Sequence, residues 1–370
     1  MCVKQPSEAV IGVDAKVHEI VSTGDQTVYS PLSLLVLLAS LLGAKAPQGQ
    51  TESQLRNGFL SLQKKPDNNL ASFDIGDQYV RQVMTSTRCN MQDTTSEDAP
   101  PIFCIANSMI IAERFEKAIK RAFIDKMTND YQFQYSTVTI DTINAWVEKN
   151  TNGMIKNFLQ EIPFDTAMLL MNTLYFKGQW EKTLDPVRNV MFESVDGQKY
   201  PMDRVGKTYS FPYLRDEERG FHVINLPFRR RFGEMQVPLD ADVYAQLVPN
   251  LVRTPVNFEI PKFRVESKHK LKPILQAVGV DDLFSRSKAN LSGMSDLPLF
   301  VSAVEQAAVL ELNEYGLEAS AVTQMTIMSK SLLTIMNPIP FICDQPFSFV
   351  LYDKQTNKIA FVGKYNRPTQ

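Results

Sequence analysis

The sequence predicts one α+β domain that spans residues 1–370. Helix-like and strand-like segments are mixed along the whole chain, and no internal repeat, low-complexity tract or Gly/Ser-rich linker divides it. The composition, with 44% hydrophobic and 22% charged residues, is that of a globular protein with ample material for a large core. Length alone would also permit two domains, but chain length is only a loose guide to the number of domains.

Three helices are predicted in the first half of the chain. Residues 30–42 form a nearly continuous apolar stretch that starts at Ser30-Pro31 and stops at Gly43, a pattern typical of a capped, buried helix. Residues 114–127 and 142–159 carry apolar residues at helical spacing. The last of these helices is interrupted at Asn152-Gly153.

Strand patterns dominate the second half. Residues 168–176 are apolar on both faces, which indicates a strand buried between two layers, and residues 300–312 read similarly. A short helix is predicted at residues 273–283, ending near Gly279. Residues 347–352 and 359–363, separated by a polar turn, predict a C-terminal hairpin.

A further strand-like stretch begins at Leu317 and has no partner strand that the sequence identifies. Every second residue in it is apolar or small, which is the period of a half-buried strand: Leu317, Ala319, Ala321, Thr323, Met325 and Ile327. No proline interrupts it before Pro338, so its backbone could form a full hydrogen-bond ladder. It runs into Lys330-Ser331, which has the form of a trypsin-type cleavage site.

Neither the net charge nor the hydropathy of the chain indicates nucleic acid or a membrane as a partner. With 39 basic and 41 acidic residues the formal net charge is −2, so no global field favours nucleic acid or a membrane as a partner. The longest apolar run, residues 34–42, is too short to cross a bilayer. The first residues lack a signal-peptide pattern, so the residues alone favour a cytoplasmic location unless a signal is absent from this chain.

No constellation of residues predicts catalysis, a metal or a cofactor. The three histidines, His18, His222 and His269, are scattered, and no nucleophile elbow, phosphate-binding loop or metal-binding motif is present. We therefore expect that the protein is not an enzyme. The four cysteines show no C-x-x-C spacing and are too few for a disulfide framework, which predicts buried free thiols for most of them.

Two basic runs offer a binding hypothesis. Arg229, Arg230 and Arg231, like residues 268–272, could bind a polyanion such as a sulfated glycosaminoglycan. More often such runs are solvated charges that protect strand edges from aggregation.

Seven motifs, in the order expected, resemble the serpin family over essentially the whole chain. They are Tyr29-Ser30-Pro31-Leu32-Ser33, Ala106-Asn107-Ser108-Met109, residues 143–155 around Trp146, Asn172 to Trp180 with its Phe176-Lys177-Gly178 core, Pro346-Phe347-Ser348-Phe349, Phe361-Val362-Gly363-Lys364, and Asn366-Arg367-Pro368. Each motif alone is weak, but the ordered set is specific.

The resemblance implies a serpin fold with three β-sheets, about nine helices and an exposed reactive-centre loop at about residues 314–340. Glu314-Tyr315-Gly316 matches the hinge at the base of that loop. In inhibitory members the cleaved bond follows roughly seventeen residues from the hinge glutamate, which selects Lys330-Ser331. An error of one residue in that count would select Ser329, and an error of two would select Met328.

The function implied is that of a monomeric, extracellular serine protease inhibitor without a cofactor. A protease would attack Lys330 and form an acyl-enzyme. The hinge, comprising Glu314, Gly316, Leu317, Ala319 and Ala321, would then insert into the main sheet as a new strand and trap the protease. A lysine before the cleaved bond implies trypsin-like targets, whose primary pocket is acidic.

Two residues depart from the family pattern. Leu317 stands where inhibitory members usually place threonine or serine, and its size could slow insertion. This favours an alternative, a non-inhibitory serpin that acts as a carrier, a chaperone or a simple protease substrate. Gln306 stands where many members have a histidine near the centre of the main sheet. Glutamine can still donate and accept, so we expect an altered hydrogen-bond network with the other residues of the sheet-opening region, Ser30, Ser33, Asn172 and Trp180.

Overall fold

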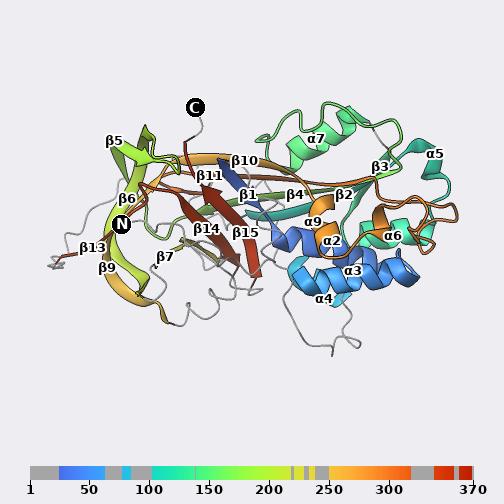
Figure 1. Cartoon of the computed structure of the whole chain (residues 1–370), viewed down its shortest axis with the longest axis horizontal. Coiled ribbons are helices and arrows are strands. Elements are labelled where there is room, and N and C mark those ends of the chain that lie inside the picture. Colours follow the sequence, from blue (N-terminus) through green and yellow to red (C-terminus); the bar gives the residue numbers. More distant parts are fainter. Residues whose placement is uncertain are drawn as a thin grey trace.

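The computed structural model describes residues 25–62, 77–84, 102–137, 139–217, 221–228, 233–237, 250–317, 337–353 and 358–368. Helices and strands are mixed in sequence but segregate in space, with most helices gathered at one end of the molecule and most strands at the other (Figure 1). Seven α-helices lie within these residues.

The first sheet, called here the central sheet, has six strands. Their order across the sheet is β10 (Phe263–Lys270), β11 (Ala303–Leu312), β12 (Gly316–Leu317), β4 (Met168–Gln179), β2 (Ile102–Ile111) and β3 (Gln134–Thr137). β4 is buried on both faces for most of its length, as its continuous apolar sequence predicts. It forms one side of the candidate functional site.

The second sheet has nine strands and divides at the long strand β6 (Lys199–Asp216). One part contains β6 with β5 (Asp185–Glu193), β9 (Val252–Pro261) and β13 (Ile339–Ile342). The other runs from the end of β6 through β7 (Phe221–Pro227), β8 (Gly233–Val237), β14 (Phe347–Asp353), β15 (Lys358–Tyr365) and β1 (Gln26–Tyr29). With the central sheet these parts give the three sheets that the resemblance implied, and β14–β15 is the predicted hairpin.

Helix α2 (Pro31–Gly43) is the predicted buried helix. The Ser30 side chain caps it by accepting a hydrogen bond from the backbone N–H of Ser33, and eleven of its residues are buried. It lies beneath the central sheet with α3 (Gly49–Leu62) and α4 (Asp77–Met84), whereas α7 (Ile140–Asn150) lies on the opposite face (Figure 1). The central sheet is thus covered on both sides.

The prediction of one continuous helix over residues 114–127 is wrong. Two helices form instead, α5 (Glu113–Glu116) and α6 (Arg121–Asn129). Between them Ile119 forms a β-bridge with Ser295, and the Lys120 N–H donates to the Met294 carbonyl at 2.8 Å. This long-range pairing uses the backbone groups that would have continued the helix.

The helix predicted at residues 142–159 ends early, at Asn150. Asn152 and Gly153 both have positive φ angles, 52° and 74°, which turn the chain back along the sheet. The following segment is tied down by Asn144, whose side chain makes two hydrogen bonds to the Leu159 backbone at 2.9 and 2.8 Å. The predicted short helix at 273–283 is α9 (Lys272–Ala277), followed by Gly279 with φ 84° and a 3₁₀ turn, η5 (Asp282–Phe284).

The cysteine prediction is confirmed for one residue and wrong for another. Cys343 is a buried free thiol, whereas Cys104, on β2, is disulfide-bonded. No C-x-x-C spacing involves Cys104, so the sequence carried no local signal for this bond. Cys2 and Cys89 lie outside the described residues.

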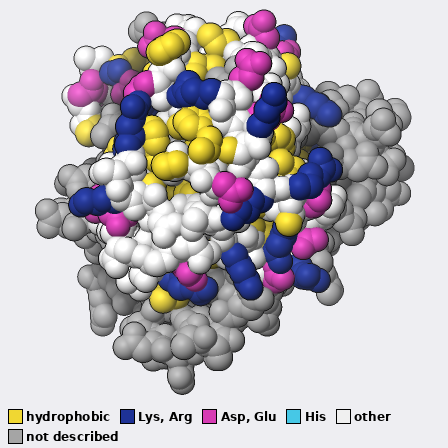
Figure 2. Space-filling model, turned by 90° about the vertical axis from the view of Figure 1, so that its right-hand side faces the viewer, with side chains coloured by type: hydrophobic (Ala, Val, Ile, Leu, Met, Phe, Trp, Pro, Cys, Tyr) yellow, Lys and Arg dark blue, Asp and Glu magenta, His cyan; other side chains and the backbone are white. Residues whose placement is uncertain are grey.

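The end of the molecule that bears α5 and α6 carries apolar side chains bordered by Lys and Arg (Figure 2). Arg114 on α5 donates to the Thr166 carbonyl at 2.8 Å, which places the segment before β4 at this end. Phe164 in that segment is 99% exposed, and Leu297 is 49% exposed. Arg286 bonds Asp165 at 2.8 Å and ties the segment before β4 to the chain between η5 and β11.

Candidate functional site

The site is the junction between β4 and β11, where the predicted hinge enters the central sheet. Along most of their length these strands pair directly and in parallel, from Leu169 and Ala303 to Tyr175 and Val309. Beyond that point they diverge, and β12 occupies the gap, antiparallel to both neighbours. Leu317 pairs with Gly178 of β4 and with Leu312 of β11. Two residues of the predicted hinge, Gly316 and Leu317, thus pair with β4, and Leu317 also pairs with β11.

Gly316 and Leu317 are shaped for this position. A Cβ atom on Gly316 would lie 2.0 Å from the Gly178 carbonyl oxygen, so only glycine permits so close an approach of the two backbones. Leu317 has no exposed surface and packs within the main hydrophobic core. The core therefore has room for this side chain at the position that it occupies.

The turn before β12 is held by polar contacts. The Asn313 side chain accepts hydrogen bonds from the N–H groups of Tyr315 and Gly316 at 2.9 and 3.2 Å. The Glu314 carboxylate bonds Lys262 at 2.9 Å. Burial alone would raise the pKa of Glu314, but the hydrogen bond from Lys262 and its positive charge outweigh burial and lower the pKa.

Trp180 and Leu184, in the segment after β4, fix the same turn from the other side. The indole Nε1–H of Trp180 donates to the Asn313 carbonyl at 3.0 Å, and its backbone N–H donates to the Tyr315 carbonyl at 2.9 Å. The Leu184 N–H donates to the Glu314 carbonyl at 2.9 Å. The indole ring stacks on Phe228 at 4.7 Å between ring centres. Trp180 thus lies against the turn before β12, at the junction of β4 and β11.

Gln306, deeper in the sheet, is the centre of a buried hydrogen-bond network. Its Oε1 accepts from the Ser30 N–H at 2.9 Å. Its Nε2 donates to the Ser33 hydroxyl, the Ser30 carbonyl and Asn172 Oδ1 at 2.9, 3.1 and 3.2 Å. Asn172 in turn donates to Asn107 Oδ1 at 2.8 Å. The structure therefore brings Ser30, Ser33, Asn172 and Gln306 together, and the altered network forms as the residue chemistry indicated.

Other site residues named from the sequence lie outside the described residues. They are Ala319, Ala321, Lys330, Ser331, Arg229, Arg230 and Arg231. Sequence reasoning missed Asn107, Lys262, Asn313 and Leu184. Only Asn313 carried a signal, since an asparagine before Glu-Tyr-Gly is a common turn former.

The described residues contain no group of three or more His, Cys, Asp or Glu that could hold a metal ion. Of the described histidines, His222 contacts the Tyr213 hydroxyl at 2.9 Å and His269 contacts the Val28 carbonyl at 2.9 Å. Among the helices that the structure describes, none is long and apolar enough to cross a membrane.

Comparison with known proteins identifies the family. The family described as Serpin (serine protease inhibitor) matches residues 16–368, so the chain belongs to the serpin family. Human neuroserpin is 28% identical, over 98% of this chain and 92% of its own length. Intracellular coagulation inhibitor 2 of Tachypleus tridentatus is also 28% identical, over 94% of this chain and 86% of its own.

A solved structure of human thyroxine-binding globulin complexed with thyroxine has the same fold. Its TM-score is 0.81 at 18% identity, over 96% of this chain and 95% of the other. The fold is therefore shared with a protein that binds a small molecule, whereas one of the two relatives above is named as an inhibitor.

Proposed function

We propose that this protein is not an enzyme but an inhibitor of trypsin-like serine proteases that acts as a suicide substrate, with Lys330-Ser331 as the reactive bond. The observation that carries the proposal is the two-residue strand β12, seated between β4 and β11 with Leu317 fully buried. A strand that has begun to insert supports further insertion, because each added residue gains backbone partners on both sides.

The register of β12 supports the proposal that the residues after Leu317 fit between β4 and β11. If pairing continues without a shift, Ala319 lies between Phe176 and Leu310, and Ala321 between Leu174 and Ala308. These residues point to the same face as the buried Leu317. Their small size suits a position between two packed strands.

The same register brings Thr323 between Asn172 and Gln306, six positions beyond Leu317 on all three strands. Those two side chains now bond each other at 3.2 Å, a bond that separation of β4 and β11 breaks. The Thr323 hydroxyl can both donate and accept, and it replaces the lost partner. Insertion therefore leaves no buried polar group unpaired at this point.

Complete insertion carries the protease to the far end of the sheet. Ile327 lies opposite Met168, the first residue of β4, and Lys330 follows three residues later. The acylated protease is then held at the end of the molecule that bears α5 (Figure 1), and Phe164, in the segment before β4, is exposed. Deacylation fails there because the strand pulls on the enzyme's active site.

Trypsin is the direct test of this function. Mixing the two proteins should give a covalent complex that survives SDS, and the released C-terminal peptide should begin at Ser331. Lys330→Ala should abolish the complex with trypsin, and trypsin without its catalytic serine should form none.

Two results would contradict the proposal. Complete cleavage without a complex would mean that the chain is a simple substrate, which is the alternative that Leu317 first suggested. A released peptide that begins at another residue would reject Lys330 as the reactive residue.

The place of action and the accessory partner are further parts of the proposal. Action outside the cell is supported by the disulfide at Cys104, since such bonds persist in oxidising compartments. We propose a monomer, and a glycosaminoglycan as a second partner through Arg229, Arg230 and Arg231. Retention on heparin that falls with salt, and that is lost in the triple alanine variant, tests this contact.

A further inference from the structure

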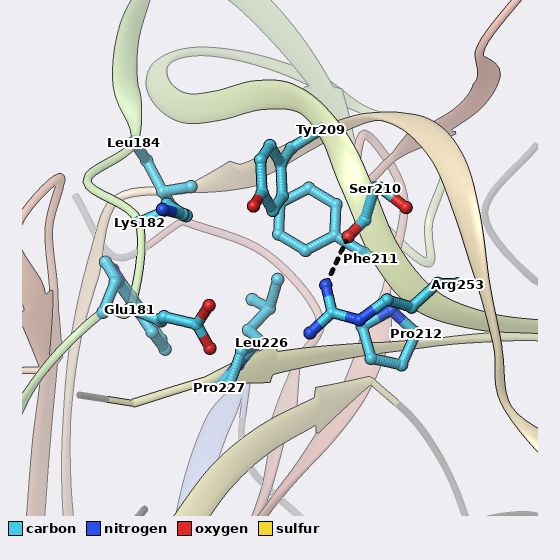
Figure 3. A pocket seen from close by; sticks show the side chains of 11 residues that line it. Glu181, Lys182, Leu184, Tyr209, Ser210, Phe211, Pro212, Leu226, Pro227 and Arg253 are labelled. Carbon is cyan, nitrogen blue, oxygen red and sulfur yellow. Dashed lines mark hydrogen bonds between the residues drawn. The ribbon is translucent and has the colours of Figure 1, made fainter. Parts of the chain in front are cut away.

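The pocket beside the turn before β12 is too small for an organic ligand. Leu184, Phe211 and Leu226 line it, and Arg253 at its rim donates to the Ser210 carbonyl at 3.1 Å (Figure 3). The enclosed space has room for about one water molecule. A more informative feature lies at the surface, in the chain between η5 and β11.

The whole sequence contains one match to the acceptor pattern for N-linked glycosylation, which is Asn-x-Ser/Thr with x other than proline. This match is Asn290-Leu291-Ser292. Asn290 and Ser292 are both exposed. The proposed inhibitory mechanism does not use these residues. A pattern of three residues also arises by chance, so the geometry around Asn290 and the compartment of the protein decide whether it is used.

The side chain of Asn290 leaves its nitrogen atom available. Its Oδ1 accepts two hydrogen bonds from Ser292, from the hydroxyl at 2.8 Å and from the backbone N–H at 3.3 Å. Because an N–H group can only donate, the oxygen must face Ser292 and Nδ2 must point away from it. Nδ2 lies beside Gly49, where a Cβ atom would be 3.8 Å away, so no side chain of that residue crowds it.

Attachment of a sugar to Nδ2 breaks no hydrogen bond with the part of the chain that the structure describes. The bonds of Asn290 within that part use its backbone groups and Oδ1. A glycan on an asparagine is bulky and hydrophilic, so it requires a side chain that projects from the surface. Asn290 meets this requirement.

The backbone around Asn290 is held in place independently of its side chain. Its N–H donates to the Thr51 hydroxyl at 3.0 Å, and its carbonyl accepts from the Gln48 N–H at 2.9 Å. Leu291 is buried, with 3% of its surface exposed. The Ser292 carbonyl accepts from the Lys120 ammonium at 2.7 Å. A glycan at this position therefore requires no rearrangement of the loop.

A second observation, from a different part of the molecule, concerns the compartment. Cys104, on β2, is disulfide-bonded. Disulfides form in the lumen of the endoplasmic reticulum, which is also where asparagine side chains receive N-linked glycans. A chain that acquires this disulfide there passes the enzyme that reads the Asn-x-Ser pattern.

We propose that Asn290 carries an N-linked glycan. The donor is an oligosaccharide linked to a lipid pyrophosphate. Nδ2 forms a bond to the anomeric carbon of the first sugar, the bond from that carbon to the pyrophosphate oxygen breaks, and the lipid pyrophosphate leaves. Nδ2 gives up one proton to a base of the transferase, and nothing is oxidised or reduced. The proposal rests on the extracellular location proposed above and is independent of protease inhibition.

The modification can be tested on the full chain, expressed behind a cleavable secretion signal in cultured human cells. Treatment with peptide N-glycosidase F in heavy-oxygen water should lower the apparent mass and convert Asn290 to aspartate that carries one heavy oxygen atom. Asn290→Gln and Ser292→Ala should each remove the glycan, whereas Ser292→Thr, which retains the hydroxyl, should keep it. Asn257→Gln, a control outside any acceptor pattern, should also keep it.

The exposure of Asn290 predicts how the glycan is removed. The glycosidase should release it from the folded protein without denaturant. The melting temperature should then change by no more than about 2 °C, because Nδ2 takes no part in the hydrogen bonds that hold the loop. Release that requires denaturation would contradict the orientation of this side chain.

Two results would overturn the proposal. One is a chain without glycan in both the medium and the cell lysate, since a molecule retained inside the cell would still have met the transferase. The other is a glycan that persists in Asn290→Gln. Trypsin added to the same preparations separates this proposal from the inhibitory function: an unmodified chain that still traps trypsin loses only the glycan, and a glycosylated chain that forms no complex loses only the inhibition.

Discussion

Gln306 shows how one residue can set the stability of the central sheet. It is fully buried and bonds α2 through Ser30 and Ser33, and β4 through Asn172. The Gln306 side chain is an amide, so protonation of a ring plays no part in this network.

Gln306→Ala should lower the free energy of unfolding by about 3–5 kcal/mol, because it leaves a cavity and several buried polar groups without partners. The apparent melting temperature measures this change. Gln276→Ala provides the control, since this exposed side chain bonds Asp281 through a long hydrogen bond of 3.4 Å. A loss no larger than that of the control would mean that the network does not stabilise the sheet.

Glu305, the neighbour of Gln306 on β11, predicts a pH dependence. Burial raises its pKa from the ordinary 4.5 to about 7, although Lys270 on the adjacent strand acts in the opposite direction. A raised carboxyl pKa means that the folded state holds the proton more tightly than the unfolded state. Stability from this group is therefore full below pH 4.5 and is lost as the pH rises through about 7.

Glu305→Gln should raise the melting temperature at pH 8 by a few degrees, which corresponds to about 1–2 kcal/mol after allowance for partial solvent screening. The gain should shrink toward zero as the pH approaches 4.5. Glu311→Gln, on the same strand, serves as the comparison. An equal gain at both pH values would exclude titration as the cause.

At the scale of elements, we expect insertion to depend on whether the side chains of β12 can be buried in the core. Leu317→Arg should leave Lys330-Ser331 open to cleavage but cut the covalent complex by at least about tenfold, because an unpaired guanidinium would have to enter the apolar core. The ratio of complex to cleaved protein measures the effect. Met191→Arg on β5, where the side chain is 47% exposed, should behave like the unsubstituted chain. If Leu317→Arg also forms complex normally, burial of this residue is not part of inhibition.

Elements with strong local patterns could be predicted from the sequence. The buried helix α2, the two-faced strand β4 and the β14–β15 hairpin follow from apolar periodicity, capping and turn residues. The break between α5 and α6 could not be predicted, because it arises from pairing with residues 294–295, far away in sequence. Local spacing carries no information about such a partner.

The candidate site, like the fold, could be predicted only in part from the sequence. The motifs identified Gln306, Asn172 and Trp180, because the family resemblance supplied their neighbours. Lys262 and Leu184 were missed, since a lysine and a leucine at a strand junction have no distinctive sequence pattern. The seating of Leu317 was also missed, because its fit depends on the gap between β4 and β11 and on the close approach that Gly316 permits.

At the scale of the whole molecule, the described fold holds a central sheet in which two strands pair in parallel below a short inserted strand. If β12 extended as a full antiparallel strand between β4 and β11, it would replace their parallel pairing and add roughly ten residues of paired backbone. Each net hydrogen bond contributes about 1 kcal/mol to the free energy of unfolding. On the proposed mechanism, we expect the intact chain to retain free energy that loop cleavage releases.

The melting temperature before and after cleavage of the loop tests this account most directly. Limited proteolysis between residues 328 and 331, followed by thermal unfolding of the nicked protein, should show a rise of more than about 10 °C, because roughly 10 kcal/mol of new pairing is gained. Leu317→Arg should show little or no rise. A nicked protein with the native sequence that melts at or below the temperature of the intact chain would contradict insertion between β4 and β11.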